Sequence, residues 1–229
     1  MTMKTYKYQM HTHTAPTSLC GAMTAEELVE ALNKEGYAGC VLTNHFMRGN
    51  TGVDRSLPWR EFVSAYEEDY LACRRYGEKY GLDILFGIEE GAGGGQEFLC
   101  YGITPRDLYE HPELANADAA LWHQTLSSLG ALVIQAHPYR VRGYITKPYP
   151  LPLDEIDGIE VCNFGNDPEF NQQAEEMARA YPHLILTSGA DTHRVTTVGH
   201  GGIETDERIS DERALVRILK SGRYTLLKE

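Results

Sequence analysis

The stretch Tyr6-Lys7-Tyr8-Gln9-Met10-His11-Thr12-His13-Thr14 lies near the start of the 229-residue chain and reads as a strand that ends in two histidines. Successive side chains of a strand point to opposite faces, so His11 and His13 point to the same face. Two imidazoles on one face can hold one metal ion between them. A His-x-His pair also occurs by chance, so the rest of the chain decides between a metal clamp and a coincidence.

The composition predicts one globular domain spanning residues 1–229, because 42% of the residues are apolar and the chain is long enough to bury a large core. The net charge of -12, from 33 acidic and 21 basic residues, argues against nucleic acid as a stable partner and against a membrane, since both are negatively charged. Five scattered cysteines without CxxC spacing, and no apolar leader after Met1, favour the cytoplasm.

Strands and helices are predicted to alternate along the chain. Capping signals and helical spacing of apolar residues predict helices that begin near Thr24, Ser56, Asp167 and Ser210. Residues 104–129 are expected to begin irregularly and to end in a further helix, which carries Trp122 and Leu126 on one face. Apolar runs predict further strands at residues 38–43, 82–88, 131–136, 158–162, 184–187 and 224–227. The glycines at 91–95 are followed by a strand-like segment at 97–101, which predicts a hairpin and not a phosphate loop. This α/β alternation predicts a largely parallel sheet, either closed into a barrel or open and doubly wound.

Polar side chains occur where several of these strands end. They are His11, His13, His45, Glu89, His137, Asp191 and His193. Residues at the carboxyl ends of different strands meet only if the strands ring a common axis, which favours a closed or nearly closed TIM-like barrel of six to eight strands. Imidazole and carboxylate are ligands of Zn, Mn and Fe, so the combination predicts a site for two or three divalent metal ions.

The same motifs, taken in chain order, resemble the PHP (polymerase and histidinol phosphatase) superfamily. They are His11-x-His13, Thr43-Asn44-His45, Gly87-Ile88-Glu89, Ala136-His137-Pro138, Gly158-Ile159-Glu160 and Gly189-Ala190-Asp191-Thr192-His193. The resemblance implies a distorted (β/α)7 barrel with a two- or three-metal site that hydrolyses phosphate esters. By position, it assigns His11, His13, Glu89 and Asp191 to a first metal, Glu89 and His137 to a second, and His45 and His193 to a third.

The chain departs from the family pattern at four positions. Gln9 and Asn44 stand where the family usually has Asp, which is expected to weaken the orientation of the ligands. Leu99 stands where relatives often place a histidine for the second metal, so the second metal is expected to be weak or to need another donor. Cys20 lies where relatives place an Asp or His, and is either a third-metal ligand or a buried packing residue.

The predicted activity is hydrolysis of a small phosphorylated molecule, a phosphomonoester or phosphodiester, by a metal-bound hydroxide. Asp191 is expected to accept a proton, and His193 or His45 to protonate the leaving group. Arg140 and Arg194 directly follow histidine motifs and are expected to clamp phosphate, with Arg48, Arg142 and Lys147 as further candidates. Two alternatives stay open: a metal-dependent hydrolase of C-N or carboxylic ester bonds, and a metal-binding protein without turnover. The oligomeric state is left open.

Overall fold

The computed structural model describes residues 4–228, so Met1 to Met3, which enter the prediction that no leader is present, lie outside the described residues. Within this range nine strands form one sheet. Their bounds are β1 (Tyr6–Thr12), β2 (Gly39–Leu42), β3 (Asp83–Gly93), β4 (Gln96–Tyr101), β5 (Leu132–Gln135), β6 (Gly158–Asn163), β7 (Ile185–Gly189), β8 (Gly202–Thr205) and β9 (Thr225–Leu227).

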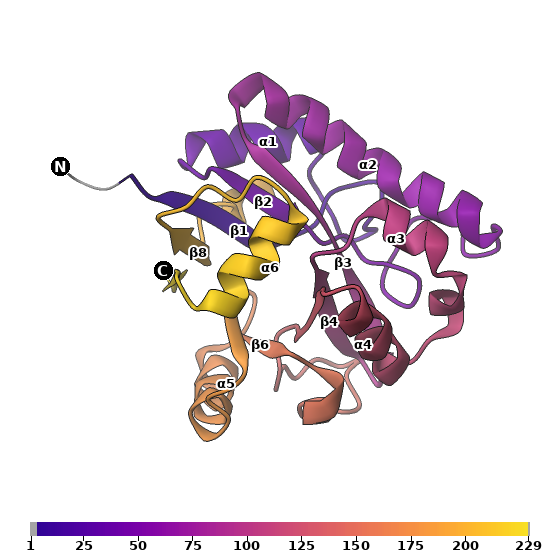
Figure 1. Cartoon of the computed structure of the whole chain (residues 1–229), viewed down its shortest axis with the longest axis vertical. Coiled ribbons are helices and arrows are strands. Elements are labelled where there is room, and N and C mark those ends of the chain that lie inside the picture. Colours follow the sequence, from indigo (N-terminus) through magenta and orange to yellow (C-terminus); the bar gives the residue numbers. More distant parts are fainter. Residues whose placement is uncertain (1–3, 229) are drawn as a thin grey trace.

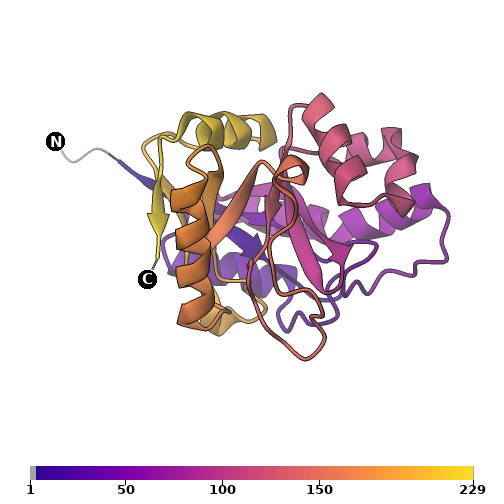
Figure 2. The ribbon, with the colours of Figure 1, turned by 90° about the horizontal axis from the view of Figure 1, so that it is seen from below.

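Helices cover the outside of the sheet and one end of it (Figures 1 and 2). They are α1 (Ala25–Lys34), α2 (Trp59–Tyr80), α3 (Pro105–Glu110), α4 (Ala119–Ser128), α5 (Pro168–Ala180) and α6 (Glu212–Ser221). Three short 3₁₀ helices span Pro112–Asn116, Leu153–Glu155 and Val195–Thr197. No helix between residues 4 and 228 combines the length and the apolar character needed to cross a membrane.

The sheet is a nearly closed barrel, which confirms the predicted distorted TIM-like architecture. The strand order is β7-β6-β5-β4-β3-β2-β1-β8-β9, with β4 antiparallel to both of its neighbours. Strands β1 to β7 form the curved wall, and β8 and β9 extend it beyond β1. The wall closes where His13 N donates to Thr192 O at 2.8 Å and Thr192 N donates to His11 O at 3.1 Å, just beyond the ends of β1 and β7.

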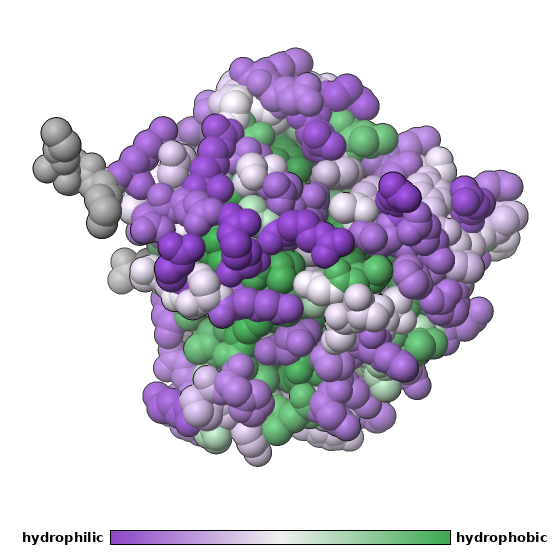
Figure 3. All heavy atoms as spheres, in the orientation of Figure 1, coloured by the Kyte–Doolittle hydropathy of each residue, from purple (hydrophilic) through white to green (hydrophobic). Residues whose placement is uncertain are grey.

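The two ends of the barrel interior differ in polarity. At one end, interior side chains such as Leu99 and Tyr101 of β4 pack in one hydrophobic cluster with Leu215 and Leu219 of α6, which closes that end (Figure 1). On this face, seen in Figure 3, apolar side chains show between hydrophilic ones near the centre of the molecule. The opposite end holds the polar residues of the strand ends and is open to solvent through a pocket of about 830 Å³.

Three local predictions differ from the structure. The segment after Ile103, expected to begin irregularly, forms the short helix α3, because Thr104 and Asp107 make a capping box. The cap of α6 is Asp211, whose carboxylate accepts from Ala214 N at 2.7 Å, and not Ser210. Strand β8 was not predicted, since its four residues carry a charged Glu204 and little apolar sequence. None of these differences moves a residue of the polar end.

The β3–β4 hairpin decides which residues of β4 reach the polar end. Gly93, Gly94 and Gly95 turn the chain with φ of 94°, 66° and 83°, values that glycine adopts without steric cost. Because β4 runs antiparallel to β3, its first residues lie beside the carboxyl end of β3. Glu97 therefore lies near the polar end, and Leu99 lies two residues deeper.

Candidate metal centre

The predicted site residues from separate strand ends meet around one carboxylate, that of Glu89 in β3. Glu89 is fully buried, and four histidine nitrogens lie near its two oxygens. The distances are 3.2 Å to His11 Nε2, 3.3 Å to His13 Nε2, 3.0 Å to His45 Nδ1 and 3.1 Å to His137 Nε2. The alternation expected at the end of β1 is present, since His11 and His13 both face Glu89.

A first group of donors consists of His11, His13, Glu89 and Asp191, whose ligand atoms all lie within 4.8 Å of one another. Asp191 Oδ1 lies 3.4 Å from His11 Nε2 and 3.3 Å from His13 Nε2. Both of these nitrogens, and Glu89 Oε2, are buried and make no hydrogen bond. Buried polar atoms without partners are costly, so this convergence of four donors fits a divalent metal ion.

Hydrogen bonds hold the rings of the first group in orientation. Glu160 Oε1 lies 3.1 Å from His11 Nδ1, and its second oxygen accepts from the backbone N of His137 at 2.9 Å. Ser18 Oγ lies 3.1 Å from His13 Nδ1 and donates to Asn44 Oδ1 at 2.9 Å. Occupying Nδ1 in this way leaves Nε2 of each ring for a metal.

The two unusual amides, Gln9 and Asn44, have structural partners. Asn44 accepts from Thr14 N at 2.8 Å and donates to Asp69 Oδ2 at 3.0 Å, so it ties together the loops after β1 and β2. Gln9 donates to the backbone oxygen of His200 at 2.5 Å. Both residues thus fix the backbone beside the site although they lack the negative charge usual in the family.

A second group of donors includes Glu97, which was not predicted from the sequence. Its carboxylate lies 3.6 Å from His45 Nδ1 and 3.5 Å from His137 Nε2. Leu99, by contrast, is fully buried among apolar side chains. The signal that could have identified Glu97 is the hairpin itself, because an antiparallel strand brings its amino end to the carboxyl end of its partner.

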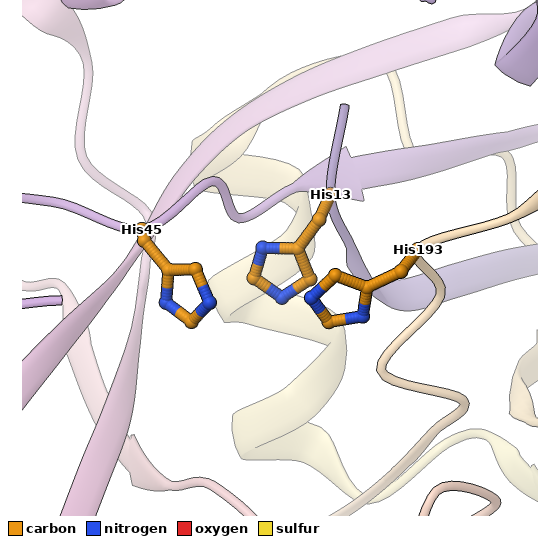
Figure 4. Close-up of side chains that lie close together, drawn as sticks. All are labelled: His13, His45 and His193. Carbon is orange, nitrogen blue, oxygen red and sulfur yellow. The ribbon is translucent and has the colours of Figure 1, made fainter. Parts of the chain in front are cut away.

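A third group consists of His13, His45 and His193, whose rings lie close together in Figure 4. The ring centroid of His13 lies 4.3 Å from that of His193 and 4.5 Å from that of His45. Cys20 is exposed, with Sγ 3.0 Å from His193 Nε2. The structure therefore places Cys20 at the rim of the site and not in the apolar core.

Burial and neighbouring charges shift the pKa values of the groups at the centre. Burial raises the pKa of Glu97 to about 8, and the charge of Glu89 adds to this effect. Burial opposes ionisation of Glu89 too, but His11 and His45 outweigh it and hold the pKa of Glu89 well below its ordinary value. Burial likewise lowers the pKa of His11, but Glu160, Glu89 and Asp191 outweigh it and the net pKa is well above the ordinary value.

The backbone is unusual at two of the candidate ligands. Among the described residues, three that are not glycine have positive φ: His137 (29°), Tyr139 (67°) and Asp191 (50°). Such conformations cost on the order of 1–3 kcal/mol each and are concentrated at functional sites. Here they turn the imidazole of His137 and the carboxylate of Asp191 toward Glu89, which regular strand geometry would not do.

The predicted phosphate-binding arginines differ in their surroundings. Arg140 is buried, donating to Asp191 Oδ2 at 2.7 Å, to Asn166 Oδ1 at 2.7 Å and to Asn163 Oδ1 at 3.0 Å. It is thus engaged in orienting Asp191. Arg194 is exposed and lines the pocket, as does Arg48, which also donates to Asn116 O at 3.0 Å. Arg142 donates to Gly165 O at 2.9 Å and is not among the residues that line the pocket.

Part of the sequence and the whole fold resemble known proteins. Residues 168–224 match a family profile described as PHP-associated. The fold resembles a two-domain protein from Bacteroides vulgatus that contains a predicted PHP-like metal-dependent phosphoesterase (TM-score 0.69, 18% identity, 97% of this chain and 64% of that one). It also resembles a metal-dependent phosphoesterase, so described, from Bifidobacterium adolescentis (TM-score 0.56, 16% identity, 93% and 96% of the two chains). No curated protein matched in sequence.

The match of residues 168–224 to a PHP-associated profile, together with the shared fold, supports the resemblance to the PHP superfamily that the motifs predicted. The structural likenesses at 12–18% identity establish the fold. The chain spans 64% of the length of the Bacteroides vulgatus protein.

The exclusion of nucleic acid on the basis of net charge was wrong. The lesion-specific endonuclease Q from Pyrococcus furiosus has a similar fold (TM-score 0.64, 13% identity, 97% of this chain and 58% of that one). A structure of endonuclease Q bound to a 27-mer duplex is similar too (TM-score 0.62, 12% identity, 95% and 57%). Overall charge does not decide the partner, because a cleft can carry a local field of its own.

Proposed function

We propose that this protein is a metal-dependent phosphoesterase whose metal ions are held at the polar end of the barrel. The observation that carries the proposal is the convergence of unpartnered, buried donor atoms, His11 Nε2, His13 Nε2 and Glu89 Oε2, on one place beside Asp191. The proposed ligands are His11, His13, His45, Glu89, His137, Asp191 and His193. Their mixed nitrogen and oxygen donors support Mn, Fe or Zn as the ions.

Divalent ions held there would activate water and neutralise charge on the phosphoryl oxygens of a substrate. In the proposed mechanism the carboxylate of Asp191, whose Oδ2 accepts a hydrogen bond from Arg140, is the proton acceptor. His193 Nδ1 donates to the backbone oxygen of Asp191 at 2.7 Å, so Nε2 is the atom that would bind an ion or, in the protonated ring, hold a proton. Where no ion occupies that nitrogen, we assign to the protonated His193 the protonation of the leaving group, with Arg140 positioning Asp191.

The pocket supports a phosphate ester as substrate. Its volume of about 830 Å³ is that of a small-molecule site, and its lining includes the cations Arg48 and Arg194 beside the glycines of the β3–β4 turn. Arg194 is exposed and can reach a phosphate without leaving another partner, so we assign it the binding of substrate. Both monoesters and diesters, including nucleotide esters, fit this description. The five cysteines are free, which supports a reducing compartment such as the cytoplasm for this activity.

A turnover screen tests the proposal. Protein reconstituted with Mn²⁺, Fe²⁺ or Zn²⁺ is offered phosphomonoesters, phosphodiesters, single- and double-stranded oligonucleotides, and amide and carboxylic ester substrates. We expect metal-dependent release of phosphate or of a phosphorylated product, with loss of that release in His13→Ala and Asp191→Asn. Turnover of acyl substrates alone would favour the C-N or ester hydrolase, and turnover that survives in both variants would contradict the mechanism.

A further inference from the structure

Glu97 and Glu89 face each other across the polar end of the barrel with an imidazole on either side. One oxygen of Glu97 lies 3.6 Å from His45 Nδ1, and the other lies 3.5 Å from His137 Nε2. The same two nitrogens lie 3.0 Å and 3.1 Å from the oxygens of Glu89. The four groups thus alternate, carboxylate and imidazole, around a common space.

Within the described part of the chain, this arrangement lacks the partners that a structural carboxylate pair needs. Glu97 is largely buried, and no described Lys or Arg nitrogen lies within 4.0 Å of its carboxylate. His45 Nδ1 and Glu89 Oε2 are buried without a hydrogen bond, in residues that are 93% or more buried. Two facing buried carboxylates that have imidazoles but no Lys or Arg beside them are expensive, whereas a divalent cation between them would balance both charges.

We propose that Glu97 is a ligand of a second divalent ion, together with Glu89 and the imidazoles of His137 and His45. This inference rests on the metal centre of the proposed function. It adds a donor for the second ion, to which the resemblance assigned only Glu89 and His137. The position two residues further along β4 cannot take this role, because Leu99 is fully buried in the apolar cluster that reaches α6. Alternate residues of a strand share a face, so the donor has moved about 7 Å along the same face of β4, toward the polar end.

The donor set indicates the kind of ion. Two carboxylates and two imidazoles offer hard oxygen and borderline nitrogen atoms with no thiolate, a combination suited to Mn²⁺ or Fe²⁺ as well as Zn²⁺. The two negative charges balance one divalent ion. Because Glu89 also belongs to the first group of donors, the two ions would share it as a bridge.

The test uses Mn²⁺ alone as the probe, on the full chain. Bound manganese per chain is measured by equilibrium dialysis with elemental analysis, and electron paramagnetic resonance distinguishes coupled from isolated ions. Wild type is expected to bind two or more ions with a coupled signal. Glu97→Gln is expected to lose one ion per chain, with affinity for it lowered more than about 100-fold, and to show an isolated six-line signal. Glu90→Gln is the matched control, since the Glu90 carboxylate accepts from the backbone nitrogens of Arg48 and Gly91 at 2.7 and 2.6 Å.

Circular dichroism and thermal unfolding of the metal-free proteins separate loss of the ligand from loss of the fold. Metal-free Glu97→Gln is expected to unfold at or above the temperature of wild type, because it removes one of two facing acidic groups. Equal manganese binding and equal coupling in wild type and Glu97→Gln would overturn the inference, as would fewer than two ions in wild type. If Glu97→Gln loses one ion but wild type hydrolyses no phosphate ester, the inference stands and the proposed function fails.

Discussion

The two sides of the Glu89 carboxylate are built by different kinds of strand. On one side, His11 and His13 lie at the carboxyl end of β1 and Asp191 follows β7. These strands run parallel to β2 and β6, so the three residues obey the rule that such carboxyl ends meet. On the other side, Glu97 comes from the amino end of an antiparallel hairpin strand. Strand direction, as well as strand order, therefore decides which residues reach the site.

The largest effect is expected from removing the group that both sides share. Glu89→Gln takes a negative charge from every donor group at once, so we expect kcat to fall by about 10³-fold, corresponding to roughly 4 kcal/mol of lost stabilisation of the transition state. Manganese bound per chain should fall on both sides. Steady-state kinetics and elemental analysis measure the two effects. A variant that keeps one full set of ions would show that Glu89 does not bridge them.

Leu99→Ala tests the hairpin side, because it leaves Glu97 in place. Leu99 is fully buried between the sheet and α6, so truncation should lower the free energy of unfolding by about 2–5 kcal/mol through a cavity in the core. The number of manganese ions bound to the folded protein should not change. Chemical denaturation and elemental analysis are the measurements. Loss of an ion from folded Leu99→Ala would instead place residue 99 close to the site.

The parallel side is tested through Arg140, which is proposed to orient Asp191. Arg140→Gln removes the 2.7 Å contact with Asp191 Oδ2, and we expect metal affinity or kcat to fall about 10- to 100-fold, as is usual for partners of ligands. Arg194→Gln is the comparison, because an exposed cation in the pocket should act mainly on KM. If Arg140→Gln raised KM and left kcat and metal affinity unchanged, Arg140 would be a substrate-binding residue instead.

The smallest effect is expected at Asp69, which binds residues of the loops after β1 and β2. Asp69 is buried and accepts hydrogen bonds from Thr14 and Asn44; burial raises its pKa, an effect that these hydrogen bonds oppose. A carboxyl group whose folded-state pKa is raised stabilises the fold at low pH, and this contribution is lost as the pH rises through that pKa. The stability of wild type relative to Asp69→Asn should therefore fall from pH 4 upward, by about 1 kcal/mol. Denaturation curves of the metal-free proteins that stay parallel over this range would contradict this account.

The sequence was informative where chemistry and strand periodicity coincide. His11 and His13 share a face because strands alternate, and the barrel follows from polar residues at the ends of successive strands. Glu97 does not fit this pattern, because it lies at the amino end of a strand that runs in the opposite direction. The positive φ of His137 and Asp191, which turns both side chains toward Glu89, is set by tertiary contacts and has no signature in residue type. The burial of Arg140 could not be predicted for a similar reason, since its partners Asn163, at the end of β6, and Asn166, just after it, lie 23 and 26 residues away in the chain.

The central claim is that the carboxylate of Glu89 lies between two metal ions, one from each side. The most direct measurement is the number of Mn²⁺ ions bound per wild-type chain at saturation, determined by elemental analysis after equilibrium dialysis. We predict at least two ions per chain. Fewer than two at saturation would contradict the claim.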